Sequence, residues 1–371
     1  MIRRLPALFG VPVLAVATRM LIAGPIAPPA GPVGGSYKTL AEIEPRVVLS
    51  QTNTPGDAGT VFIISAPGSY ILDGNVQISS GKSAIRLDSD DVTIDLRGFA
   101  IDGSTSPAAT SFGSGIFTTA PRRNISVRNG TIRGMGGYGI TGAVLLANFD
   151  NLALIDNKLG QLEVFGADDS IARNLRISTS GGEADLTLGE NATVESCTIE
   201  GGFLGIQVTS GVISRCTVRN TVGVGIRTGS ATVSDCYVSG VSSAGSFSNG
   251  GIVTSSGARV ERCAVRQCIA PGIFIGGDST IAGCTVSSCA IGLRETIFLS
   301  GHAHIEGNTF LQCTLAISLD TAHQLVIGNR FSGNATNITA APGCAIGEFV
   351  DISAGGTLAG ASMHPATNIN Y

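Results

Sequence analysis

Short apolar segments alternate with polar ones at a regular interval over residues 193–331. Each segment holds aliphatic or β-branched residues around a small central residue, usually Cys. The central residues are Cys197, Cys216, Cys236, Cys263, Cys284, Asn308 and Asn329, in steps of 19, 20, 27, 21, 24 and 21 residues. A period near twenty residues with insertions between the copies is typical of a solenoid, in which each repeat stacks on the one before it.

A second apolar pair, Gly-Ile or a close variant, comes before each copy. The pairs are Gly205-Ile206, Gly225-Ile226, Gly251-Ile252, Gly272-Ile273, Gly292-Leu293 and Ala316-Ile317. Segments this short, rich in β-branched residues and bounded by Gly, Ser, Thr, Asn and Asp, predict strands and not helices. Stacked coil on coil, they would form parallel sheets around one narrow core. The sequence therefore predicts an all-β parallel β-helix of about eleven coils between residues 84 and 331.

The same pattern divides the chain into five predicted parts. They are a signal peptide (residues 1–23), a Pro/Gly linker (24–36), an N-terminal cap with the first strands (37–83), the parallel β-helix (84–333) and a C-terminal cap (334–371). A capping box at residues 39–42 predicts a short helix over the first coil, because an uncovered coil exposes unpaired strand edges.

The first residues predict export. Arg3 and Arg4 precede an apolar stretch at residues 5–17, and small residues that fit a cleavage site follow. We expect a secreted, periplasmic or cell-surface protein without a membrane span after signal removal, since the apolar run is short and interrupted. The alternative is an apolar tail that stays attached.

Composition narrows the function classes. The chain has 51 Gly, no Trp, 13% charged residues and a formal net charge of −4. This composition suits a β-solenoid, and the absence of a basic patch disfavours a nucleic-acid partner. The sequence leaves the oligomeric state open.

Eight of the nine cysteines recur at two sites of the repeat. Five lie at the central position given above, and Cys268, Cys289 and Cys313 follow five residues after it on three coils. Stacked strands lie about 4.8 Å apart, whereas a disulfide needs a Cβ separation near 3.8 Å. We therefore expect two rows of buried thiols that act as small apolar fillers, with occasional disulfides between neighbours as the alternative. No C-x-x-C pair or zinc-like His spacing occurs, so we expect no metal and no cofactor.

Several segments before the cysteine series resemble a known family. They are Gly56-Asp57 and residues 67–70, 80–82, 92–99 and 128–134. With the coils they resemble the right-handed parallel β-helix repeat proteins exported by bacteria, which are related in fold to pectate lyases. The resemblance implies a right-handed β-helix with N- and C-terminal caps. It implies little about activity, since β-helices carry many functions.

One outward column of the predicted coils could bind a ligand. The residue after each Gly-Ile pair should point outward, and this column includes Phe117, Gln207, Arg227 and Phe274. Exposed Phe rings among Arg and Gln could form a platform for sugar rings. The alternative is that neighbouring loops cover both Phe side chains.

Acid–base groups gather at one further place. Arg294 is followed by Glu295, His302 and His304, and with Arg227 these Arg and His side chains are the catalytic candidates. The alternative is a solvated loop. We expect an extracellular module that binds or processes a polysaccharide or cell-surface glycan. Enzyme status stays open between polysaccharide lyase, epimerase and glycoside hydrolase. The alternative function is a non-catalytic structural or adhesion protein.

Overall fold

The computed structural model describes residues 46–79, 81–104, 113–179, 184–243, 249–295, 301–355 and 364–371. All of them belong to one compact unit, Pro45–Tyr371. The regular elements assigned in this part of the chain are all strands. The predicted signal peptide, linker and short helix lie outside the described residues. Nowhere in the described ranges does a helix reach the length and apolarity needed to cross a membrane.

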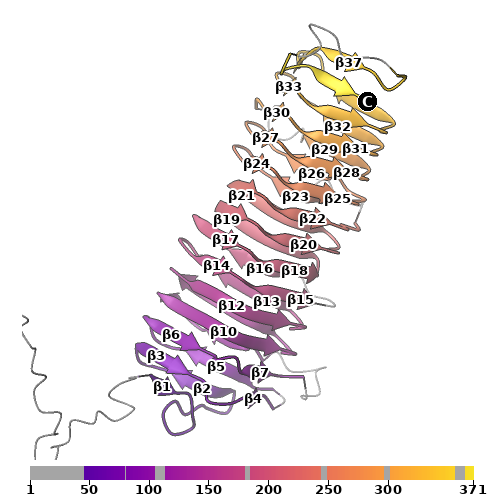
Figure 1. Cartoon of the computed structure of the whole chain (residues 1–371). Coiled ribbons are helices and arrows are strands. Elements are labelled where there is room, and N and C mark those ends of the chain that lie inside the picture. The colour runs from indigo at the N-terminus through magenta and orange to yellow at the C-terminus, as the bar shows by residue number, and fades with distance from the viewer. Residues whose placement is uncertain are drawn as a thin grey trace, which may run out of the picture. The chain divides into compact units, whose positions relative to one another are not determined.

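The strands stack in three parallel columns, as successive turns of one winding chain (Figure 1). Column A holds β2 (Thr60–Ile64), β5 (Ser83–Leu87), β8 (Ile116–Thr118), β11 (Tyr138–Leu145), β13 (Gly160–Phe165), β16 (Ala184–Leu188), β19 (Leu204–Ser214), β21 (Val224–Ser234), β23 (Gly250–Thr254), β26 (Ile273–Ile275), β29 (Ile291–Glu295), β32 (Leu315–Leu319) and β35 (Thr336–Ala340). The long strands β19 and β21 bend from column A into column B.

Column B follows column A around each coil. It holds β1 (Val47–Val48), β3 (Gly68–Ile71), β6 (Val92–Asp95), β10 (Ile125–Arg133), β12 (Asn148–Ile155), β14 (Ile171–Arg173), β17 (Ala192–Glu195), the ends of β19 and β21, β24 (Arg259–Glu261), β27 (Thr280–Ala282), β30 (His304–Glu306), β33 (Leu325–Ile327) and β36 (Ala345–Ile346). The short strand β9 (Arg122–Arg123) pairs with the end of β11.

Column C completes each coil. It holds β4 (Val76–Gln77), β7 (Ala100–Asp102), the ends of β10 and β12, β15 (Arg176–Thr179), β18 (Thr198–Gly201), β20 (Thr217–Arg219), β22 (Tyr237–Ser239), β25 (Ala264–Arg266), β28 (Thr285–Ser287), β31 (Thr309–Leu311), β34 (Arg330–Ser332), β38 (Asn368–Asn370) and β37 (Phe349–Asp351). The predicted all-β parallel β-helix is confirmed.

The described coils number about thirteen, two more than the eleven expected. Eleven strands of column A, from β5 to β32, match the predicted coils, and β2 and β35 add one strand at each end. The two extra strands lie in segments that the sequence analysis assigned to caps. A terminal strand has a neighbour on one side only, so its apolar positions are fewer and the repeat phrase is harder to recognise there.

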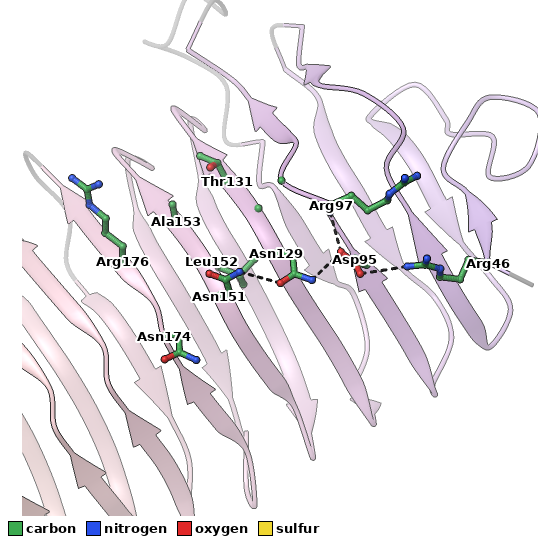
Figure 2. Close-up of a pocket in the computed structure, with 12 residues that line it drawn as sticks. Arg46, Asp95, Arg97, Asn129, Thr131, Asn151, Leu152, Ala153, Asn174 and Arg176 are labelled. Atoms are coloured by element: carbon green, nitrogen blue, oxygen red, sulfur yellow. Dashed lines mark hydrogen bonds and ion pairs between the residues drawn. The ribbon is translucent and has the colours of Figure 1, made fainter. Parts of the chain in front are cut away.

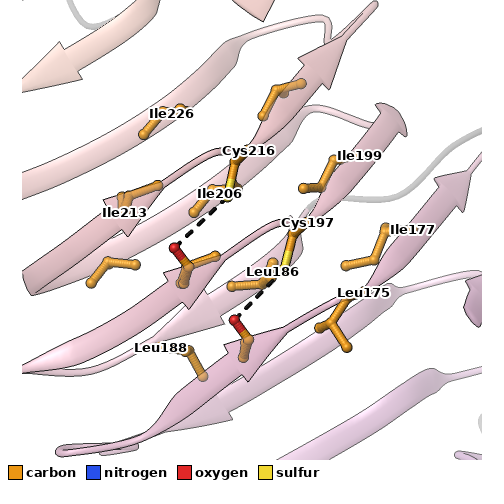
Figure 3. Close-up of a cluster of buried hydrophobic side chains, with 14 of the residues drawn as sticks. Leu175, Ile177, Leu186, Leu188, Cys197, Ile199, Ile206, Ile213, Cys216 and Ile226 are labelled. Atoms are coloured by element: carbon orange, nitrogen blue, oxygen red, sulfur yellow. Dashed lines mark hydrogen bonds between the residues drawn. The ribbon is translucent and has the colours of Figure 1, made fainter. Parts of the chain in front are cut away.

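The core is a single apolar column inside the coils. Inward residues such as Ile199, Ile206 and Ile213 are fully buried, and Figure 3 shows them around Cys197 and Cys216. The strand register on both sides of the cysteines places all five central thiols at one turn position between columns B and C. Each of them is at most 2% exposed, and all nine cysteines are free. The predicted alignment of the thiols is confirmed.

Asparagine replaces cysteine in the row of central residues on the last coils. The amide of Asn329 accepts hydrogen bonds from the backbone N–H of Asn308 at 2.9 Å and from its Nδ2 at 3.1 Å. It also donates to the carbonyl oxygens of Ile305 and Ile327 at 3.0 Å. Asn368 continues the row with the same bonding toward Asn329. A buried amide here satisfies backbone groups of its own coil and of the coil before it.

Two coils depart from the Gly-Ile pattern. The register of column A places Gln161 and Asp185 where neighbouring coils carry Gly139 and Gly205. Both polar side chains are 0% exposed. Gln161 exchanges hydrogen bonds with Asn157, at 2.7 Å in each direction. Neither carboxyl oxygen of Asp185 has a hydrogen-bond partner among the described residues.

Candidate binding groove

A groove of about 630 Å³ runs over the turns between columns B and C in the N-terminal half of the chain (Figure 2). Four consecutive coils form it, from the β6–β7 turn to the β14–β15 turn. Its polar lining consists of Arg46, Asp95, Arg97, Asn129, Thr131, Asn151, Asn174 and Arg176. Four turns stacked in register therefore present their side chains along one line.

Local backbone conformation explains the row of amides. Arg97, Asn129, Asn151 and Asn174 have positive φ angles of 52°, 59°, 52° and 56°. Asn tolerates this left-handed conformation better than most residues, because its short side chain bonds locally. The Nδ2 of Asn151 donates to Oδ1 of Asn129 at 3.0 Å, and Nδ2 of Asn174 donates to Oδ1 of Asp150 at 2.9 Å. These bonds hold the amides in a row along the groove.

Asp95 is a carboxylate in the groove wall that accepts several hydrogen bonds. Its carboxylate accepts hydrogen bonds from the backbone N–H of Arg97 at 2.9 Å, Nδ2 of Asn129 at 3.1 Å and Nε of Arg128 at 3.3 Å. Arg46 contacts the same carboxylate at 3.5 Å. Burial alone would raise the pKa of Asp95, but these donors outweigh it and lower the pKa. Asp95 therefore stays ionised and holds the wall in place.

The groove carries a net positive charge. Its lining includes three Arg side chains and one carboxylate. The carboxylate of Asp95 already accepts hydrogen bonds from the donors described above. Arg97 and Arg176 are exposed at opposite ends of the row. Guanidinium groups bind carboxylates with paired hydrogen bonds, and amides bind hydroxyl groups as donor or acceptor. The arrangement suits a ligand that carries both groups.

The outward column expected from the sequence lies on column A. Each of these residues pairs in register with a residue on an adjacent coil. Phe117 pairs with Arg86, Gln207 with Arg227, and Phe274 with Arg294. Phe117, Gln207 and Arg227 are half-buried, and burial lowers the pKa of Arg227.

Phe274 differs from these three, because its side chain is 8% exposed. It belongs to a small apolar cluster with Leu204, Val224 and Val253. Its ring is covered by side chains of neighbouring strands, whereas the alternative expected loops to cover both Phe117 and Phe274.

The catalytic candidates pair with different carboxylates. Arg294 contacts Asp320 at 3.4 Å, Nδ1 of His302 lies 3.7 Å from Asp278, and Nε2 of His304 lies 3.4 Å from Glu306. Arg227 and Arg294 are three coils apart in the register, which is roughly 14 Å.

Glu295, the carboxylate of the predicted acid–base cluster, has a structural role as a buried hydrogen-bond acceptor. Its carboxylate is 0% exposed and accepts hydrogen bonds from Thr321 and from Nε2 of Gln324, the latter at 2.7 Å. Burial raises its pKa.

Sequence reasoning missed the groove residues. A signal was present, because Asn129, Asn151 and Asn174 each precede an inward position and recur at steps of 22 and 23 residues. These coils lack the central Cys, so the repeat was less visible there. Arg46 lies far from the other lining residues in the sequence, and only the winding of the chain brings it to Asp95.

Comparisons with solved structures return β-helices. The A-module of the Azotobacter vinelandii mannuronan C-5 epimerase AlgE4 is 12% identical, with 75% of this chain and 91% of that chain covered and a TM-score of 0.49. A tailspike protein of the E. coli bacteriophage HK620 in complex with a hexasaccharide is 10% identical, with 88% and 71% covered and a TM-score of 0.47. Pectate lyase Pel9A is 13% identical, with 78% and 74% covered and a TM-score of 0.37. No curated protein sequence matches the chain.

A family model gives the assignment. The model described as a right-handed β-helix region matches residues 114–254 and 213–349, which together span more than half of the chain. The matched ranges run from β8 to the start of β37 and contain the aligned cysteines together with Asn308 and Asn329. The expected right-handed winding is confirmed, and the chain belongs to the right-handed β-helix family.

Proposed function

We propose that this protein is an extracellular module that binds an acidic polysaccharide along the groove between columns B and C. The positive row from Arg46 and Arg97 to Arg176 carries the proposal. Sugar carboxylates would pair with Arg97 and Arg176, and sugar hydroxyls would bond to the amides of the Asn row. The basic and apolar start of the chain supports export.

The groove suits an extended chain better than a single small molecule. It is open along its length and crosses four coils, about 14 Å from the first turn to the last. Small-molecule sites are usually concave and mostly apolar, whereas this lining is largely polar. A polymer laid along the row would contact one turn after another.

Binding of an uncharged glycan and of a polyuronate provides the test. We expect the wild-type protein to bind polyuronate more tightly, with an affinity that falls as salt is added, since exposed charges are screened. The double variant Arg97→Asn/Arg176→Gln should lose roughly tenfold in affinity, as expected for two exposed ion pairs of up to about 1 kcal/mol each. Asn is chosen at position 97 because the backbone there has a positive φ.

Two matched variants locate the site. Arg266→Gln removes an exposed Arg of column C far along the solenoid and should leave binding unchanged. Arg227→Gln tests the predicted contact surface of Phe117, Gln207 and Arg227 on column A. If the double variant bound polyuronate with wild-type affinity, the groove would not be the binding site. If only Arg227→Gln lost affinity, the binding site would lie on column A. Failure of the wild type to bind any glycan would favour a structural or adhesion role.

A further inference from the structure

We propose that His302 and His323 together bind one divalent transition-metal ion on the turns between columns A and B. The register pairs Thr280 with His304 and His304 with Leu325. Asp278, His302 and His323 each lie two residues before one of these partners. They therefore occupy the same turn position on three consecutive coils, far along the solenoid from the Arg groove.

The distance between the two imidazoles suits one shared ion. Their ring centroids are 5.7 Å apart and the planes are tilted by 42°. A Zn²⁺–N bond is about 2.0–2.1 Å long, which puts a ligated ring centre roughly 3 Å from the metal. Two rings about 6 Å apart can thus reach the same ion from opposite sides. Both residues are exposed, so their side chains have room to rotate toward a shared ion.

Asp278 lies beside the first imidazole. Its Oδ1 accepts a hydrogen bond from the backbone N–H of His302 at 2.9 Å and lies 3.7 Å from Nδ1 of the same residue. A metal-binding His usually donates its other ring N–H to a carboxylate, which fixes the tautomer. In the proposed complex Nδ1–H of His302 turns toward Asp278, and the lone pair of Nε2 binds the metal.

The donor set defines the class of ion. Neutral imidazoles favour Zn²⁺, Ni²⁺ and Cu²⁺, whereas Ca²⁺ and Mg²⁺ require oxygen ligands. No three His, Cys, Asp or Glu side chains of the described residues converge on one point as a complete metal cage. The proposed site has two protein ligands, and water or an anionic group would complete the coordination. The His302 side chain is 76% exposed, so an ion can reach it from solvent.

Calorimetric titration of the untagged protein with Zn²⁺ and Ni²⁺ at pH 7.5 tests the site. We expect one ion per chain, and at least a tenfold loss of affinity in His302→Asn and in His323→Asn. Asn suits position 323, where φ is 72°. Asp278→Asn should weaken binding about 10–100-fold, as for other carboxylates that support a metal-bound His.

Controls separate this site from other metal-binding groups. His364→Asn removes an exposed imidazole whose Nδ1 accepts a hydrogen bond from Ala366 N–H, and should leave affinity unchanged. The double variant His302→Asn/His323→Asn keeps all nine cysteines, so any ion that it still binds at wild-type affinity is held elsewhere. Such retained binding, or no uptake of either ion by the wild type, overturns the proposal. The Arg97→Asn/Arg176→Gln variant should take up metal normally, which keeps this outcome independent of glycan binding.

Discussion

Asp185→Asn is expected to stabilise the protein above neutral pH by several kcal/mol. The carboxyl group of Asp185 is 0% exposed, and within the described part of the chain neither of its oxygens has a hydrogen-bond partner. Burial raises its pKa to about 8, against about 3.9 in an unfolded chain. The folded state therefore retains a proton that the unfolded state releases between these two values. Stability is highest below about pH 4 and falls as pH rises toward 8, by about 5 kcal/mol in all.

The asparagine side chain has nearly the same shape as the protonated carboxyl group but cannot ionise. Urea unfolding of both proteins between pH 4 and pH 9 should give similar midpoints at pH 4 and a widening gap above it. Asp169→Asn is the matched control, since Asp169 is exposed and has a positive φ that Asn accepts. Its midpoint should follow the wild type at every pH. A constant gap between Asp185→Asn and the wild type would contradict the prediction.

Asn329→Ala should lower the free energy of unfolding by about 3 kcal/mol or more. The amide of Asn329 bonds to Asn308, Ile305 and Ile327 in the buried row on the last coils. Alanine would leave the backbone N–H of Asn308 and the carbonyl oxygen of Ile305 without these partners, and each buried polar group left unsatisfied costs about 1–3 kcal/mol. The carbonyl oxygen of Ile327 keeps its hydrogen bond from the backbone N–H of Gly307. Urea unfolding followed by circular dichroism measures the loss.

Cys236→Ala provides the comparison at the same turn position. The Sγ of Cys236 contacts the carbonyl oxygens of Ser234 and Ile213 at 3.2 and 3.8 Å, and no backbone N–H of the described residues bonds to it. Its removal leaves a small cavity and should cost clearly less than Asn329→Ala. Equal losses would mean that the asparagines act as space fillers like the thiols, and not as partners of the backbone.

The fold was predictable because each coil repeats the same physical requirement. A residue that faces the narrow core must be apolar on every turn, so a row such as Cys197 to Cys284 appears in the sequence as a period near twenty. The prediction was incomplete where the pattern is interrupted. Gln161 and Asp185 occupy positions that carry Gly on neighbouring coils. Because these two coils lack the Gly of the Gly-Ile pair, the repeat is harder to recognise there.

Site chemistry was harder to predict than the fold. Arg46, Asp95 and Arg176 meet at one groove although long stretches of chain separate them, and nothing in their local sequence links them. His302 was recognised as a chemical group, but its neighbour His323 was not, because their proximity depends on the exact number of residues in the intervening coil. Phe274 shows the converse, since its outward position was correct and its exposure was decided by neighbouring side chains.

The amino-acid sequence alone determined the winding of this protein, its rows of like residues and the membership of its core, because burial acts on every coil in the same way. The tertiary structure decided which outward residues lie together, which are covered and which carboxylate is left unpaired. Those outcomes depend on the register between coils, and a single inserted residue in one turn changes which side chains become neighbours.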